Sequence, residues 1–145
     1  MRFMLLLKGE PPEDALPSAE LIDAMLGYYE QLVKAGVLLA GEGLLSSSTG
    51  ARVVYSGGKR TVIDGPFTEA KELVAGYYLI QVKSREEAIE WAKRCPLEAA
   101  VDQFGDSGVS EAVIEIRQVA EMDEIGATDE QQETEARLRE QTPGL

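Results

Sequence analysis

Hydrophobic residues gather in four short stretches that predict β-strands. Residues 2–8 and 74–82 carry apolar side chains at nearly every position, so both faces of each strand are apolar. Residues 37–40 and 112–119 predict two further strands. Because alternate side chains of a strand point to opposite faces, the first two strands must be covered on both sides in the folded protein.

Two stretches instead follow the 3.6-residue period of an amphipathic helix. The first begins after Ser18, a good N-cap, and ends at Gly36. The second begins after Ser84, and Pro96 ends it. Residues 97–110 show no clear period and are expected to form a loop.

The middle of the chain predicts a β-hairpin. Residues 52–55 and 60–63 are strand-like and flank Gly57 and Gly58, which supply the positive φ angles of a tight turn. A turn at 64–67 and a short helical turn at 68–72 follow the hairpin.

The order β-α-β, hairpin, β-α-β predicts an α+β fold of the ferredoxin-like βαββαβ kind with a hairpin extension. Two helices can cover only one face of its sheet, yet two strands are apolar on both faces. Either a second copy of the sheet covers the other face, which gives a homodimer, or the tail and long loops fold back over it. The tail is polar, so we favour the homodimer.

Composition narrows the class of protein. The chain has 145 residues, enough for one domain with a real core. It has one cysteine and no histidine, so it has no internal disulfide. The apolar start ends at Lys8, too early for a membrane span or a signal peptide, and we expect a cytoplasmic protein without membrane association.

The charge is concentrated at the C-terminus. The net charge is −12, and residues 121–145 hold eight acidic and two basic residues, a net of −6. An acidic chain without a basic stripe repels phosphate backbones, so direct nucleic-acid binding is not expected. We expect a domain over residues 1–125 and an acidic tail over 126–145, either a solvated helix or disordered. The tail could also dock a basic partner.

Several ordered motifs resemble one known family. Residues 62–69 read Val-Ile-Asp-Gly-Pro-Phe-Thr-Glu, Lys71-Glu72 follows, and residues 76–80 read Gly-Tyr-Tyr-Leu-Ile. Supporting pieces are Ala-Gly-Glu-Gly-Leu at 40–44, Trp-Ala-Lys-Arg-Cys-Pro at 91–96 and Ile-Glu-Ile-Arg at 114–117. Together they resemble the DGPF-type proteins of the YCII-related family over residues 1–125.

This resemblance implies a bacterial source and a ferredoxin-like fold that dimerises into an α/β barrel. DGPF-type genes often lie beside genes for extracytoplasmic-function sigma factors, which suggests a regulatory association and a protein partner. Some YCII-related proteins resemble lyases or dehydrochlorinases with a His–Asp pair. This chain has no histidine, so that pair cannot be carried over.

Three charged residues are candidates for catalysis. Asp64 is either a turn residue that binds its own backbone or a general base at a pocket mouth. Glu42, between two glycines, is either an exposed residue at a strand bulge or a carboxylate that pairs with Asp64 or Arg117 across a cleft. Arg117 is expected to meet one of these two carboxylates, since an unpaired buried charge is costly.

Candidate ligand-binding residues are Tyr78, Lys71 and Phe67. Lys71 lies either on a solvated turn or against an anionic ligand, and one of Tyr77 and Tyr78 could line a cavity. Cys95 lies at the negative end of a helix, which disfavours a reactive thiolate. No zinc site or phosphate-binding glycine loop is present in the sequence, and no cofactor is expected.

These residues support two hypotheses. The first is a homodimer that binds a small molecule or a protein partner, linked to sigma-factor regulation. The second is a histidine-independent lyase or isomerase that acts on a small organic compound, with Asp64 or Glu42 as base and Arg117 stabilising charge.

Overall fold

A four-stranded antiparallel sheet forms the centre of the computed structural model, which describes residues 1–107 and 110–144. The described residues form a mixed α+β fold with four α-helices. The strands lie in the order β2-β5-β1-β6, with bounds β1 Arg2–Lys8, β2 Leu38–Gly43, β5 Val74–Gln81 and β6 Ile114–Gln118. The two central strands, β1 and β5, are those predicted to be apolar on both faces.

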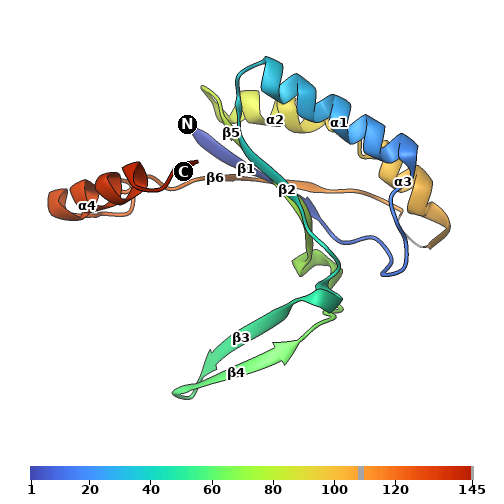
Figure 1. The fold of residues 1–145 in the computed structure, drawn as a ribbon, viewed down its shortest axis with the longest axis horizontal. Coiled ribbons are helices and arrows are strands. Elements are labelled where there is room, and N and C mark those ends of the chain that lie inside the picture. Colours follow the sequence, from blue (N-terminus) through green and yellow to red (C-terminus); the bar gives the residue numbers. More distant parts are fainter. Residues whose placement is uncertain (108–109, 145) are drawn as a thin grey trace.

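Three helices lie on the same side of this sheet (Figure 1). They are α1 (Ala19–Lys34), α2 (Arg85–Lys93) and α3 (Glu98–Phe104). No helix in the described ranges has the length and apolar character needed to cross a membrane. Within the described residues, the opposite face of the sheet carries no helix (Figure 1), so this part of the chain covers one side only.

The helix predicted between Ser18 and Gly36 is confirmed. The Ser18 hydroxyl accepts a hydrogen bond from the Leu21 amide at 3.1 Å, which satisfies a free donor of the first turn. Gly36 has a φ of +70°, the left-handed conformation that ends many helices. α2 is capped similarly, because the Ser84 hydroxyl accepts from the Glu87 amide at 3.1 Å.

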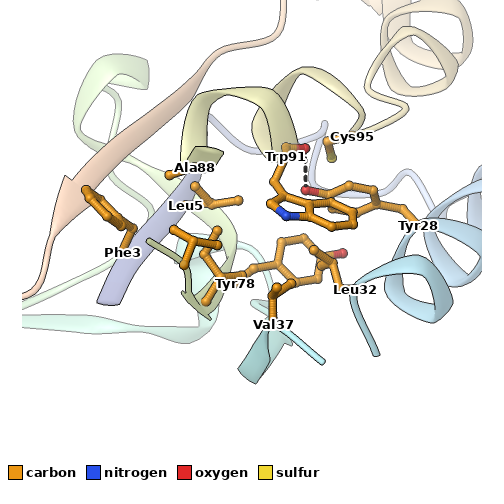
Figure 2. Close-up of a cluster of buried hydrophobic side chains, with 11 residues drawn as sticks. Phe3, Leu5, Tyr28, Leu32, Val37, Tyr78, Ala88, Trp91 and Cys95 are labelled. Carbon is orange, nitrogen blue, oxygen red and sulfur yellow. Dashed lines mark hydrogen bonds between the residues drawn. The ribbon is translucent and has the colours of Figure 1, made fainter. Parts of the chain in front are cut away.

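The core lies between the sheet and helices α1 and α2 (Figure 2). Alternate residues of the central strands supply Phe3, Leu5 and Ile80, which are almost fully buried. Burying each such side chain stabilises the fold by about 1.5–3 kcal/mol relative to leaving it exposed. Their neighbours along the strands face the other way, so the core accounts for only one face of the sheet.

The edge strand β2 is longer than predicted, because its glycines do not end it. Gly41 and Gly43 pair with β5, and the register shift lies between Leu38 and Ala40 rather than at Glu42. A side chain at Gly41 would lie 2.8 Å from the Tyr78 ring, and one at Gly76 would lie 2.8 Å from the Glu42 carbonyl oxygen. These glycines therefore permit close packing inside the sheet.

The predicted hairpin is confirmed as β3 (Ala51–Ser56) and β4 (Lys59–Asp64), which form a separate two-stranded sheet. It extends away from the side of the sheet that carries the helices (Figure 1). Its base is held by the turn at Gly65, whose amide donates to the Gly50 carbonyl at 3.0 Å. A Cβ atom on Gly65 would lie 1.8 Å from the Ser47 carbonyl oxygen, so only glycine fits there.

The prediction of a loop over residues 97–110 is wrong for the described part of it. Glu98–Phe104 forms α3, and a short 3₁₀ turn, η3, covers Gly105–Ser107. Pro96 ends α2 but is also tolerated just before a helix, since the first turn needs no backbone donor there. The N-cap, Leu97, makes no capping hydrogen bond, so the local sequence carries no start signal, and Phe104 is buried. Residues 108 and 109 lie outside the described residues.

The C-terminal tail, for which a solvated helix and a disordered segment were the alternatives, contains a helix. α4 (Asp129–Glu140) begins with a capping box, in which Thr128 and Gln131 satisfy each other's backbone amides. None of its described residues is buried, and it projects away from the sheet (Figure 1).

The last core strand is shorter than the predicted 112–119. β6 begins at Ile114 and ends at Gln118.

Gly65→Ala is expected to destabilise the protein by about 1–3 kcal/mol, the usual cost of forcing extra volume into a packed site. The added methyl group would overlap the Ser47 backbone, which cannot move aside as a flexible side chain does. Urea unfolding measures the change. The control is Gly27→Ala in α1, where nothing lies within 4 Å and alanine favours the helix. Equal stability of the two variants would contradict this account of the turn.

Candidate functional site

A cleft of about 850 Å³ opens where β2 ends and β5 begins, between α1 and the end of the sheet. Its walls are mostly apolar, with Leu21, Met25 and Tyr29 from α1 and Phe104 from α3. A cleft of this size and character suits a small organic molecule.

Polar side chains are grouped at this end of the sheet. Glu42 comes from β2, Tyr77 and Tyr78 come from β5, and Lys71 comes from the 3₁₀ turn η2 (Ala70–Glu72). Glu42 and Tyr77 are paired in register on adjacent strands, so they share one face of the sheet. The structure thus brings Glu42, Lys71 and Tyr78 of the predicted site residues to one cleft.

Tyr78 lies on the face of the sheet opposite to Glu42 and Tyr77. It lines the cleft and is also part of the hydrophobic core. Its ring packs edge-to-face on Tyr28, with 5.3 Å between ring centroids and an interplanar angle of 83°. The Tyr28 hydroxyl donates to the Trp91 carbonyl oxygen at 2.8 Å (Figure 2). Burial raises the pKa of Tyr78 to about 12, so its hydroxyl stays protonated at neutral pH and can only act as a hydrogen-bonding group.

A hydrogen-bonded latch that sequence reasoning missed joins three loops beside the cleft. The Glu10 carboxylate accepts from the Ser47 amide at 2.7 Å and from the Ser47 hydroxyl at 3.0 Å. The same hydroxyl accepts from the Phe67 amide at 3.0 Å. A charged acceptor strengthens such bonds. No sequence signal links these three residues, because they are far apart along the chain.

Asp64 and Phe67 belong to the base of the hairpin rather than to the cleft lining. Asp64 is the last residue of β4, opposite Ala51, and it is exposed. The Phe67 ring lies under the guanidinium of Arg52, with 3.8 Å between the Arg52 carbon and the ring centroid. Arg52 also pairs with Glu72 at 3.3 Å, so these contacts brace the turn.

Within one copy of the chain, Arg117 does not meet either of the carboxylates predicted for it. It lies on β6, and its guanidinium contacts the Glu115 carboxylate at 3.5 Å while remaining 71% exposed. Glu42 lies on β2, at the opposite edge of the sheet. Three strand spacings separate these edges, roughly 14 Å. Arg117 needs no buried partner because its side chain is not buried.

The thiol of Cys95 is part of the core. Burial raises its pKa to about 12 from an ordinary value of 9.0, which makes the reactive thiolate scarce at neutral pH. Among the described residues, no three acidic or thiol groups lie close enough together to hold a metal ion.

The stability of the protein is expected to fall as pH rises from about 9 to about 12. The pKa values of Cys95 and Tyr78 are both raised in the folded state, from 9.0 and 10.0. In this window the unfolded chain therefore releases these protons first, and ionisation favours unfolding. Urea midpoints at pH 8, 9, 10 and 10.5 measure the effect. Cys95→Ala should flatten the decline near pH 9, and a midpoint unchanged between pH 8 and 10.5 would contradict the assignment.

Comparison with known proteins gives a similar chain among the curated proteins. An uncharacterized protein of Rhizobium meliloti (strain 1021) is 39% identical over 61 residues, which are 42% of this chain. The match spans 49% of that protein, about half its length.

Among solved structures, one similar chain is a 5-chloro-2-hydroxyhydroquinone dehydrochlorinase from Burkholderia phenoliruptrix AC1100, in complex with 2,5-dihydroxybenzoquinone. Its sequence is 18% identical, the TM-score is 0.42, and the alignment covers 85% of this chain and 98% of the other. At this level of likeness the neighbour's reaction is a property of the neighbour alone.

The family model of the YCII-related domain matches residues 1–123, which include the whole sheet, the three helices that cover it and the cleft. The resemblance read from the motifs at 62–69 and 76–80 is therefore confirmed at the level of the family. The chain belongs to the YCII-related family.

Proposed function

We propose that this protein is a homodimer that binds a small, largely apolar compound with an acidic group in the cleft beside α1. The observation that carries the proposal is the cleft itself, in which apolar walls lie beside Glu42, Lys71 and Tyr78 at one end of the sheet. Ligand sites typically combine apolar walls with a few polar groups that orient the ligand.

The chemistry of the lining favours a ring compound or an organic acid. Tyr29, Tyr78 and Phe104 offer aromatic surfaces to a flat apolar body. Lys71 is an exposed ammonium group at the cleft and can pair with a carboxylate or phenolate of the ligand. Glu10 also lines the cleft, but its carboxylate is already bound by Ser47.

The dimer is supported by the uncovered face of the sheet. Met4 and Leu6 of β1 and Tyr77 and Leu79 of β5 alternate with core residues and are only partly buried in one copy of the chain. A contiguous apolar surface of this kind favours association. The strand order β2-β5-β1-β6 supports a ferredoxin-like protomer, and packing two such faces together would form the α/β barrel predicted from the family resemblance.

The second candidate function is a histidine-independent lyase or isomerase. It is favoured by one observation, the Glu42 carboxylate at the cleft, where it could take a proton from a bound compound. Asp64 and Arg117 do not line the cleft of a single copy, so their predicted catalytic roles would require the second copy of the dimer. Chemical change of a bound compound, detected by mass spectrometry, distinguishes this function from simple binding.

The finer family assignment adds a regulatory side to the proposal. The Asp-Gly-Pro-Phe turn at 64–67 supports membership of the DGPF-type subgroup. Because genes of that subgroup often lie beside sigma-factor genes, the resemblance suggests a role in sigma-factor regulation. In this version the bound compound changes the affinity of the dimer for a protein partner. Such coupling requires that the ligand and the partner favour the same state of the dimer.

Lys71→Met is expected to weaken the binding of aromatic and aliphatic carboxylates about tenfold, the scale of one charge-assisted hydrogen bond. Their neutral amide analogues should bind the variant and the original protein alike. Isothermal titration with matched acid and amide pairs measures this difference. Lys83→Met, an exposed lysine outside the cleft, is the control. Acids that bind no better than amides would contradict the proposed ligand class.

Leu79→Glu is expected to convert the dimer to folded monomers, because a charge on the apolar face cannot be desolvated in the interface. Sedimentation velocity gives the oligomeric state, and circular dichroism checks that the variant folds. Val33→Glu, on the exposed side of α1, is the control and should remain dimeric. A monomeric original protein, or a Leu79→Glu dimer of unchanged affinity, would overturn the face-to-face arrangement.

A further inference from the structure

The β3–β4 hairpin, called here the hairpin arm, is apolar and exposed. Val53 and Tyr55 of β3 share one face with Val62 and Arg60 of β4, since these residues are cross-strand partners. Val62 is 65% exposed and Tyr55 is 69% exposed. A two-stranded ribbon is only marginally stable alone in water, and an apolar exposed edge invites further contacts. The hairpin arm therefore needs a surface to pack on.

The hairpin arm is also basic. Between residues 51 and 64 it carries Arg52, Lys59 and Arg60 against Asp64, a net charge of +2. Arg52 is occupied by Glu72 and the Phe67 ring at the base. Arg60 lies over the Tyr55 ring, 5.1 Å from its centroid. Within the described residues, neither Lys59 nor Arg60 has a carboxylate within ion-pair distance.

The C-terminal segment offers the complementary surface. A groove of about 540 Å³ lies between α4 and the preceding turn, and its lining includes Met122, Ile125, Glu130, Glu135 and Leu138. We call it the α4 groove. Ile125 and Leu138 are 65% and 54% exposed, so its apolar part is open to solvent.

The surroundings of the α4 groove are acidic. Residues 121–140 carry eight acidic side chains against Arg137 and Arg139, a net charge of −6. Glu135 is bound by Arg139, which donates from Nε at 2.7 Å. Glu130 has no basic partner within the part of the chain that the structure describes. Basic and acidic surfaces attract each other and fix the orientation of a complex.

The two surfaces leave the sheet at diagonally opposite corners. The hairpin arm follows the end of β2, where Gly43 is in register with Gly76 and Leu7, at the C-terminal end of β1. The segment leading to α4 follows β6, where Gln118 pairs with Phe3, at the N-terminal end of β1. β2 and β6 are opposite edges of the sheet. The hairpin arm and α4 therefore extend on either side of the uncovered face (Figure 1).

We propose that the hairpin arm of one copy docks in the α4 groove of a second copy, an exchange that rests on the proposed dimer. The two-fold axis of this dimer lies between the two uncovered faces, parallel to the sheets and midway between the two diagonally opposite corners. Rotation about this axis brings the hairpin arm of each copy to the α4 of the other copy. Val62 and Tyr55 then cover Ile125 and Leu138. Lys59 and Arg60 then face Glu130 and its acidic neighbours. One symmetric interface thus covers three exposed apolar surfaces at once.

The exchange assigns a role to two sets of contacts at opposite corners of the sheet. Glu121 binds Arg2 in a two-bond ion pair, with 3.0 Å from Nε and 3.1 Å from Nη2, which ties the start of the tail to β1. At the other corner, the latch of Glu10, Ser47 and Phe67 holds the base of the hairpin arm. Both surfaces are thus anchored to the sheet on which the second copy packs.

Disulfide crosslinking tests the exchange directly. A copy with Val62→Cys and a copy with Ile125→Cys, distinguished by a size tag, are mixed and oxidised. We expect a crosslinked heterodimer, whereas each copy alone gives none, and the buried native Cys95 serves as the background control. Absence of the heterodimer while the proteins remain dimeric would overturn the exchange and leave the face-to-face dimer in place.

Charge reversal provides an independent measurement. Arg60→Glu and Glu130→Arg are each expected to weaken dimerisation about tenfold, because the contact occurs twice in a symmetric dimer. The double variant Arg60→Glu/Glu130→Arg should recover most of the lost affinity. The controls Arg85→Glu and Asp23→Arg, at exposed residues of α2 and α1, should leave it unchanged. Sedimentation gives the dimer dissociation constants. Failure of the double variant to recover would contradict the pairing, and a monomeric original protein would overturn the dimer and the exchange together.

Discussion

The sheet of this protein has two apolar faces, and the described chain supplies helices for one of them. Phe3, Leu5 and Ile80 are buried beneath α1 and α2, whereas Met4, Leu6 and Leu79 point to the other side and stay partly exposed. Removing apolar surface from water is the main driving force of folding and association. Both the proposed dimer and the proposed docking of the hairpin arm are ways of covering that second face.

A second constraint is the joint between the sheet and the hairpin arm. Gly65 approaches the Ser47 backbone so closely that no side chain fits, and the Ser47 hydroxyl binds Phe67 while its amide binds Glu10. The residues of the Asp-Gly-Pro-Phe turn are therefore held by packing and backbone hydrogen bonds within one copy. This explains a distinctive sequence motif without requiring Asp64 to act as a base.

The cleft and the joint share residues, which couples them physically. Glu10 lines the cleft and holds Ser47, and Lys71 lies on the short turn that follows the joint. A compound that moves Glu10 would loosen the base of the hairpin arm. If the hairpin arm docks on a second copy, ligand binding and association are linked through this carboxylate, and such coupling acts equally in both directions.

Local patterns in the sequence determined much of the fold. The apolar alternation of β1 and β5, the Ser18 cap and the Gly57-Gly58 turn predict their elements, because strand alternation, capping and positive φ depend on neighbouring residues. The absence of histidine also excluded one catalytic mechanism from composition alone. The family resemblance is also confirmed, because each motif that carries it is a short run of neighbouring residues.

Tertiary structure decided what depends on residues that are distant along the chain. Helix α3 has no cap and is stabilised by burying Phe104, and the extent of β2 depends on the space its glycines leave for Tyr78. Strand order placed Arg117 and Glu42 on opposite edges of the sheet, although the cost of an unpaired buried charge had suggested that they meet. Glu42 instead lines the same cleft as Lys71. Sequence spacing carries no information on strand order, because order is set by which apolar faces pack together over the whole sheet.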